Sequence, residues 1–416
     1  MKWESLGFKE NPFSTDPISQ VTLPIYVGHE AEIKIGDTVL DEKNVLVVIE
    51  GARGIGTTSF ANYLRFSAQT KELYFTPKNE IRVEPNWNLE TLLAVIISNI
   101  VREIELSLPP KIVKDKRFQE TKALSLRIAE AYRSFGISAF GFGVNYGKSS
   151  GIISQPIIVP SSVLGHHLED LSTLIQSAGY KYGTIVQLNN LDVGTIHNED
   201  HLKYLFNAMR DYFQTGGISW LLVGDVGLRQ FIAQQVDRLD DIISHEMEIN
   251  ALQKTEYMGL VRKRINYYRA NPKAQFPIDE VVFSYLYDIT KGRLRYIFGL
   301  LHRLFNALSV GDLTDRITLD IAKPMIVQLA QDRVKRNKLS YGEEQILRVV
   351  AELGEVSVSK LAEKVNKATN YVSNILVALA QSGLVTVRQE GRMRYYTPEL
   401  DAIIAYGQGV KPDKRQ

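Results

Sequence analysis

Residues 51–59, which read GARGIGTTS, could hold a phosphate group, because their glycines have the spacing of a Walker A loop. Such a loop works through consecutive backbone N–H groups and the N-terminus of the following helix, which together surround the phosphates. Thr58 and Ser59 would supply a hydroxyl for magnesium. The predicted nucleotide-binding residues of the loop are Gly51, Arg53, Gly54, Ile55, Gly56, Thr57, Thr58 and Ser59.

Thr57 occupies the position at which Walker A loops carry lysine, and it brings no charge. One charge-assisted hydrogen bond contributes about 1.5 to 3 kcal/mol, so its loss weakens phosphate binding without removing the backbone groups. Arg53 could partly replace the missing cation. The alternative is a glycine-rich turn between a strand and a helix that binds no phosphate, as occurs in many α/β domains.

A second apolar run, TIVQL, ends in Asn189 and Asn190, with Asp192 close behind, where a Walker B motif would carry carboxylates. Those carboxylates hold magnesium and polarise the attacking water, whereas asparagine can neither neutralise the metal nor act as a base. We therefore assign no catalytic residue and expect hydrolysis to be lost. A polar strand end satisfied by nearby backbone is the alternative.

The elements that must position these residues follow from the periodicity of the apolar residues. Continuous apolar runs predict buried strands of a parallel sheet at 45–49, 184–188 and 220–223. Amphipathic stretches predict helices at 58–67, 89–106, 200–214 and 228–235. This alternation predicts a layered α/β domain over residues 1–250, and the glycine-rich stretch 134–160 predicts a β-ribbon inserted into it.

The rest of the chain predicts two further units. Residues 251–332 carry apolar residues at spacings of three and four, which predicts a helical lid. After a basic linker, RVKRNK, residues 339–407 predict three helices and a hairpin in the order of a winged helix-turn-helix. Residues 408–416 predict a flexible tail.

In a winged helix, the third helix presents its first turns to the major groove of DNA, and the wing contacts the backbone. The candidate DNA-binding residues are Lys367, Thr369, Asn370, Tyr371, Ser373 and Asn374 on the helix and Arg388, Arg392 and Arg394 on the wing. Residues 339–416 carry ten Lys and Arg against nine Asp and Glu, so this unit is not basic overall. Docking of a protein is the alternative use of such a unit.

The composition excludes several classes of chemistry. The chain of 416 residues has no cysteine, which removes disulfides, thiolate catalysis and cysteine-ligated zinc. Its apolar runs are too short to cross a bilayer and its first residues lack the apolar core of a signal peptide, so we expect a cytoplasmic protein without a membrane partner. His197 and His201 have a metal-ligand spacing, but their surroundings favour a solvated helix start, and we predict no metal.

Taken in order, these motifs resemble AAA+ ATPases of the replication-initiator (origin-recognition type) and transposition-regulator branch over almost the whole chain. Further stretches carry the resemblance: GFKENPF (7–13), YVGHEAEI (26–33) with His29 at an arginine position, WLLVGDVGL (220–228) with Asp225 at the sensor 1 position, DRLDD (237–241) and KGRLR (291–295).

The resemblance implies a parallel-sheet P-loop domain with a lid, ATP or ADP as the ligand, with or without magnesium, and DNA as a partner. It also implies an arginine finger at Arg238, a sensor 2 arginine at Arg295, and a homo-oligomer or a partner ATPase-type subunit. Together with the neutral Thr57 and Asn189, it predicts a DNA-associated regulator or assembly factor with a hydrolysis-deficient site. Two alternatives stay open. One is an ATP-hydrolysing switch of the STAND-like or transposition type that uses Arg53 and Asp192, with phage defence as one role that the resemblance allows. The other is a scaffold whose winged helix binds protein.

Overall fold

The computed structural model describes residues 3–134, 159–193, 196–308, 316–390 and 393–407. Its contacts divide the chain into two compact units, one formed by Asp16–Glu256 and the other by Met1–Thr15 together with Tyr257–Gln416. We call the first the α/β unit and the second the helical unit, and describe each by itself. Within the described ranges, no helix is both long enough and apolar enough to cross a membrane.

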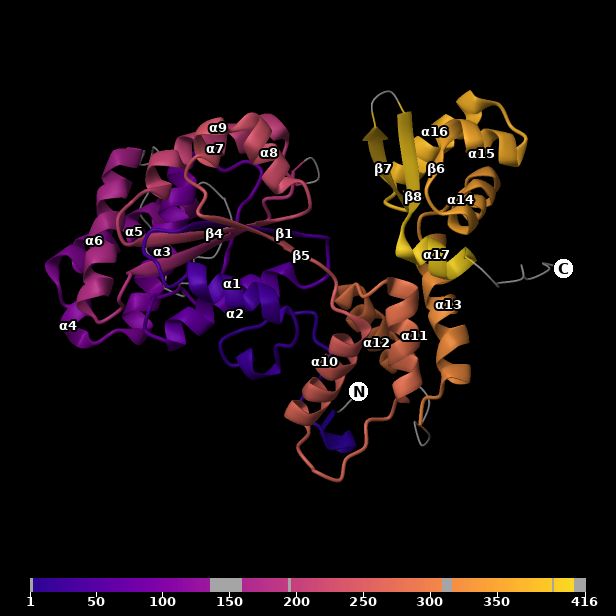
Figure 1. Cartoon of the computed structure of the whole chain (residues 1–416), viewed down its shortest axis with the longest axis horizontal. Coiled ribbons are helices and arrows are strands. Elements are labelled where there is room, and N and C mark those ends of the chain that lie inside the picture. The colour runs from indigo at the N-terminus through magenta and orange to yellow at the C-terminus, as the bar shows by residue number, and fades with distance from the viewer. Residues whose placement is uncertain (1–2, 135–158, 194–195, 309–315, 391–392, 408–416) are drawn as a thin grey trace. The chain divides into compact units, whose positions relative to one another are not determined.

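The α/β unit is built on a five-stranded parallel sheet in the order β2-β3-β4-β1-β5, of which Figure 1 labels β4, β1 and β5. Its strands are β1 (Leu46–Gly51), β2 (Ile81–Arg82), β3 (Thr184–Asn189), β4 (Ile218–Gly224) and β5 (His245–Ile249). All three predicted strands lie in this sheet. A parallel sheet is covered on both faces, which is why these strands read as continuous apolar runs.

Alternate residues of the central strands enter two separate cores, one on each face of the sheet. Val47 and Ile49 pack with Phe60 of α2, whereas Val48 and Leu222 point to the opposite face. The helices of this unit are η2 (Leu23–Ile25), α1 (Glu30–Val39), α2 (Thr57–Thr70), α3 (Leu89–Ser107), α4 (Pro110–Val113), α5 (Lys116–Ser134), α6 (Ser161–Ser177), α7 (Glu199–Phe213), α8 (Leu228–Gln235) and α9 (Asp237–Asp240). The four predicted helices correspond to α2, α3, α7 and α8.

Helices α5 and α6 were not predicted, although α6 carries a clear signal. Leu164, Leu168 and Leu171 recur at helical spacing and are buried in the core shared with α3. The predicted β-ribbon at 134–160 lies almost wholly outside the described residues, and Ser134 itself is the last residue of α5.

The helical unit begins with the N-terminal segment. Its helices are η1 (Trp3–Leu6), α10 (Lys254–Tyr268), α11 (Glu280–Thr290), α12 (Leu294–Leu308) and α13 (Leu319–Lys335). We predicted residues 1–15 to lie in the α/β domain, and this was wrong. Trp3, Phe8 and Phe13 stack around Phe276 at ring-centroid distances of 6.3, 5.4 and 5.4 Å, and this aromatic burial holds the segment in the helical unit.

The C-terminal part of the helical unit has the predicted order of three helices and a hairpin. Its elements are α14 (Tyr341–Leu353), β6 (Val356–Ser357), α15 (Val358–Val365), α16 (Thr369–Gln381), β7 (Val385–Glu390), β8 (Met393–Pro398) and α17 (Leu400–Tyr406). The strands form an antiparallel sheet in the order β6-β8-β7. Ser340 and Glu343 form the predicted capping box at the start of α14. Helix α17 was not predicted, and it packs against α13.

Candidate functional site

The loop between β1 and α2 has the backbone of an anion-binding turn. Gly54 and Gly56 have positive φ angles of 87° and 117°, which glycine adopts without steric cost. Gly56 is the N-cap of α2 and provides no side-chain cap bond to the first turn of that helix. The N–H groups of this turn are therefore left for an outside acceptor, and the helix dipole favours an anion there.

Gly51 is required by close packing at the end of β1. A Cβ atom there would lie 2.7 Å from the carbonyl oxygen of Ile249 and 2.7 Å from the Thr57 hydroxyl. Thr57, at the lysine position, therefore turns its side chain back toward the strand end. The Ile55 side chain is buried and holds the loop against the core, whereas the Arg53 side chain is exposed. The loop keeps its backbone geometry with a short neutral side chain in place of a cation.

The two predicted nucleotide motifs meet in space. The Asn189 amide nitrogen donates to the Thr58 hydroxyl over 3.5 Å, and the Asn189 amide oxygen accepts a bond of 2.9 Å from the Gln187 amide. All three side chains lie at the carboxyl ends of β1 and β3, where parallel strands place ligand groups. Both amide groups of Asn189 are thus bonded within the protein. Gln187 was missed from the sequence, although a polar residue inside an apolar strand is a usable signal.

Ser59, the second predicted hydroxyl, holds a neighbouring segment. It accepts the backbone N–H of Ile18 at 3.2 Å, and the Asn62 amide donates to the Ile18 carbonyl at 2.7 Å. These two side chains lie one turn apart on α2 and fix the chain that precedes α1. Thr58 is therefore the hydroxyl of the pair that faces the end of β3.

Asn190 and Asp192 lie beyond the end of β3. Asn190 has a left-handed φ of 64°, which asparagine tolerates better than most residues. Asp225, at the predicted sensor 1 position, accepts the Val193 backbone N–H over 3.2 Å. The loops after β3 and β4 are therefore tied together. Gly224 permits this approach, since a Cβ there would collide with the Leu191 carbonyl.

Glu50 was not predicted as a functional residue, but its carboxylate sits beside the loop. It accepts the backbone N–H groups of Gly227 and Arg229, at 3.1 and 2.9 Å, and so caps α8. An acidic residue directly before a Walker A glycine was the available signal. Glu50 thereby connects the end of β1 to the helix that follows the sensor 1 position.

The box at residues 26–33 forms a compact polar cluster. His29 bonds through Nδ1 to the Tyr26 hydroxyl and through Nε2 to the Asn250 carbonyl, both at 2.9 Å. Tyr26 stacks on Tyr63 of α2 with 4.5 Å between ring centroids. Burial raises the pKa of the Tyr26 hydroxyl, which keeps it protonated. His29 thus joins the start of α1 to the end of β5.

His197 and His201 face each other at the start of α7. Their rings stack with 5.6 Å between centroids, and His201 Nε2 bonds to the Trp87 carbonyl at 2.8 Å. His197 is 1% exposed, and desolvation holds its pKa below the usual value. Across the described ranges, no group of three or more His, Cys, Asp or Glu side chains could hold a metal ion.

The two predicted nucleotide-sensing arginines lie in different units. Arg238 is exposed on α9, and its backbone carbonyl accepts from Arg210 Nε at 3.3 Å. Arg295 lies in the first turn of α12, in the helical unit. Both assignments stay predictions.

The predicted DNA-reading residues lie at and around the start of α16. The exposed ones are Lys367, Thr369, Asn370, Tyr371 and Asn374, and Ser373 is half-buried. The Tyr371 hydroxyl lies over Gly342 at the start of α14, where a Cβ would collide with it. The sequence thus places a polar, largely uncharged surface on this helix.

The predicted wing carries one arginine that is already paired. Arg388 bonds through Nε to Glu355 at 3.1 Å and lies over the Tyr395 ring at 5.2 Å. Arg394 is exposed on β8 opposite Gln389. Arg392 lies outside the described residues.

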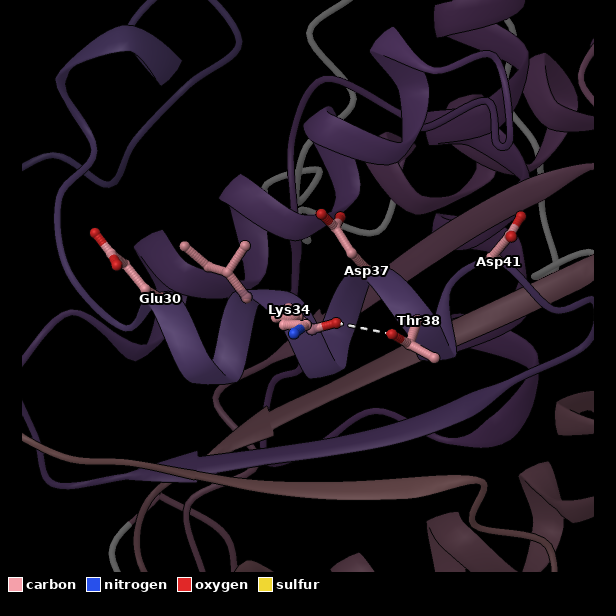
Figure 2. Close-up of a pocket in the computed structure, with 6 residues that line it drawn as sticks. Glu30, Lys34, Asp37, Thr38 and Asp41 are labelled. Carbon is pink, nitrogen blue, oxygen red and sulfur yellow. Dashed lines mark hydrogen bonds between the residues drawn. The ribbon is translucent and has the colours of Figure 1, made fainter.

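A surface hollow over α1 involves none of these residues (Figure 2). Its lining residues are Glu30, Ile33, Lys34, Asp37, Thr38 and Asp41. Asp37 and Asp41 pair with Lys71 and Lys181 at 2.8 and 3.5 Å. Because Asp37 and Asp41 are already paired with neighbouring lysines, we assign this hollow no ligand.

The parallel sheet, the glycine loop between β1 and α2, and the helical C-terminal region define an α/β protein with an AAA+ origin-recognition-like fold. The ORC2 protein of Aeropyrum pernix, solved in ADPNP–ADP complexes, is similar over 95% of this chain and 96% of that chain, with 15% identity and a TM-score of 0.51. At this identity, the likeness confirms the predicted fold and nothing finer.

Two further solved structures are similar at lower scores. The ORC1 protein of Aeropyrum pernix in complex with DNA shares 15% identity over 92% of this chain and 94% of that chain, with a TM-score of 0.47. Cdc6p from Pyrobaculum aerophilum shares 13% identity over 94% and 96%, with a TM-score of 0.43. Residues 332–404 match a family model described as a domain of unknown function (DUF8462). No curated protein matches the chain.

Proposed function

We propose that this protein is a DNA-associated AAA+-like regulator or assembly factor that binds an adenine nucleotide and hydrolyses it poorly. The observation that carries the proposal is the contact between Asn189 and Thr58. An amide stands where a carboxylate would be needed, and it is bonded to the hydroxyl on which magnesium binding would depend.

Nucleotide binding is supported by the backbone of the loop. Gly54 and Gly56 have the positive φ angles of an anion-binding turn, and the N-cap of α2 forms no side-chain cap bond. The similar ORC2 structure contains ADPNP and ADP, which makes an adenine nucleotide the natural ligand to test. Backbone N–H groups of 54–59 would hold the phosphates.

Magnesium fits this site poorly. Hard divalent cations prefer carboxylate oxygens, and the last residue of β3 offers the amide of Asn189, whose oxygen already accepts from Gln187. We therefore infer that nucleotide binds without a strict need for magnesium. Calorimetric titration of ATP and ADP, with magnesium and with EDTA, tests this: equal affinities support it, and binding seen only with magnesium contradicts it.

DNA binding is supported by the C-terminal elements, which we interpret as a winged helix. The start of α16 exposes Asn370 and Lys367, which have the chemistry to read an adenine edge and to contact a phosphate, and Arg394 is exposed on β8. Fluorescence anisotropy with a labelled duplex, repeated over a series of salt concentrations, tests this. Specific or non-specific contact with phosphates gives an affinity that falls steeply with salt.

A scaffold role is the outcome if no duplex binds at low salt. Tyr341, Val387 and Met393 are 80%, 46% and 49% exposed, and such side chains suit a protein partner.

A second candidate function, an ATP-hydrolysing switch, is favoured by one observation. The Asp225 carboxylate is tied to the backbone of Val193, next to Asp192, so acidic residues follow two adjacent strands of the sheet. In this case Asp192 would assume the role of the missing carboxylate and Arg53 that of the lysine. A turnover assay with magnesium and ATP decides between the two: clear hydrolysis that is lost in Asp192→Asn favours the switch.

A further inference from the structure

Helix α13 packs against both α12 and α17 in the helical unit (Figure 1), and three arginines lie on α12 and at the end of α13. Tyr296 and Arg303 lie two turns apart on one face of α12, and Arg333 lies in the last turn of α13, with Arg336 at its C-cap. Asp401, in the first turn of α17, reaches into the same place. We call Arg303, Arg333 and Arg336 the arginine cluster.

Asp401 is the single carboxylate that pairs with the arginine cluster in the described part of the chain. One of its oxygens lies 2.7 Å from Arg333 Nη1, and the other accepts from the Tyr296 hydroxyl. Both oxygens are therefore engaged. Of the three arginines, Arg333 alone forms an ion pair with this carboxylate, and Arg303 bonds to a backbone carbonyl instead, so positive charge at this site exceeds negative charge.

Arg303 lies within the electrostatic influence of the other two arginines. Arg303 is half-buried and bonds through Nε to the Gly299 carbonyl at 3.2 Å. Burial, together with the charges of Arg333 and Arg336, holds the pKa of the Arg303 guanidinium below its usual value. Like charges held close together are relieved by an incoming anion, and guanidinium groups match phosphate oxygens geometrically.

The site is open to a ligand. The Arg333 side chain is 40% exposed, and Arg336 is exposed beside the exposed Lys335 and Lys338. This basic row continues away from the cluster along the end of α13 and the linker to α14. A small anion would occupy the cluster alone, whereas a polyanion would use the row as well.

We propose that the arginine cluster binds a backbone phosphate of duplex DNA and forms a contact separate from α16 and the wing. This inference rests on the proposed DNA binding and adds a second anchoring point on the lid side of the helical unit. Because a phosphate contact carries no sequence information, it raises affinity for all sequences alike. It also increases the number of counterions released on binding.

The test compares the full-length wild-type chain with the double variant Arg303→Gln, Arg336→Gln in duplex-binding titrations at several salt concentrations. Arg333 is kept because its ion pair with Asp401 holds α17. We expect an affinity loss of at least about tenfold at low salt and a salt slope that is smaller by about one per lost phosphate contact.

The matched control is Arg262→Gln, Arg316→Gln, which removes the same charge from the same unit. These arginines pair separately with Glu280 and Asp279, away from the cluster. An unchanged slope and affinity in the cluster variant, or an equal loss in the control, overturns the inference while DNA binding itself stands. Absence of duplex binding by the wild-type chain overturns both. Unchanged melting temperatures show that each variant is folded.

Discussion

The Asn189 amide donates to the Thr58 hydroxyl, which joins the strand end of β3 to the first turn of α2. The same amide is held from the other side by Gln187. A neutral chain of three side chains thus links the end of β3 to α2 beside the proposed nucleotide site. Substitutions that restore charge at Thr57 and Asn189 therefore test whether the proposed site needs magnesium to bind nucleotide.

Restoring the two missing charges should restore a need for magnesium. In Thr57→Lys, Asn189→Asp, the new carboxylate can still accept from Gln187, so the strand end keeps its bonding. We expect ATP affinity with magnesium to exceed that with EDTA by about tenfold or more, since charged contacts contribute about 1.5 to 3 kcal/mol each. Calorimetry measures both. Equal affinities in the double variant would show that the loop does not hold phosphate in the Walker manner.

Gly51→Ala should destabilise the α/β unit and weaken nucleotide binding. The added methyl group meets the Ile249 carbonyl and the Thr57 hydroxyl at 2.7 Å, and overpacking of this kind costs about 1 to 3 kcal/mol. Urea denaturation gives the free energy of unfolding. The control is Gly216→Ala, because nothing lies within 4 Å of a Cβ at that glycine. A similar loss in both variants would contradict the packing argument.

Glu355→Gln should strengthen DNA binding by releasing Arg388. The two side chains form an exposed ion pair at 3.1 Å, and an arginine released from its carboxylate is available to phosphate. We expect a higher affinity and a steeper salt dependence in anisotropy titrations. Glu352→Gln removes another exposed carboxylate, from α14, and should have a smaller effect.

The wing has a complementary test. Changing Arg388, Arg392 and Arg394 to alanine should weaken duplex binding and lower the salt slope by up to about three. Full binding by this triple variant would rule out the wing as a DNA contact.

The stability of the α/β unit should fall when the pH is lowered through the range in which His197 titrates. Its folded pKa lies below the usual value of about 6.5 because the ring is buried. The unfolded chain therefore binds a proton first, so the stabilisation is complete above about pH 6.5 and is lost as the pH falls towards the folded pKa.

His197→Phe should flatten the dependence of the urea midpoint on pH between about 7.5 and 5.5. Some dependence should persist, because burial also lowers the pKa of His167. His166→Phe is the control, since the His166 side chain is 76% exposed. If the two variants follow the same pH curve as the wild-type chain, His197 does not titrate on unfolding.

The sequence predicted the elements whose signal is local. Apolar runs located β1, β3 and β4, and glycines marked the turn into α2, because burial on both sheet faces and positive φ angles restrict residue types directly. The capping box at Ser340 was found for the same reason. These features depend on residues within a few positions of one another.

Features that depend on distant partners were missed. The N-terminal fifteen residues were assigned to the wrong unit because the sequence does not indicate which distant residue their aromatic rings pack against. In the structure that residue is Phe276. Likewise, Asn189 was identified as a neutral substitution, but its bond to Thr58, more than a hundred residues away, could come only from the folded sheet. The pairing of Arg388 with Glu355 is a third case.

Helix α17 has a consequence for how the chain can be divided. Asp401 ties it to Arg333, so a boundary drawn at residue 339 separates two helices that share one interface. The match to a family model begins at residue 332, inside α13. A C-terminal fragment intended to fold independently should therefore start at Leu319. A fragment that starts at residue 339 should expose the apolar side of its own last helix, α17.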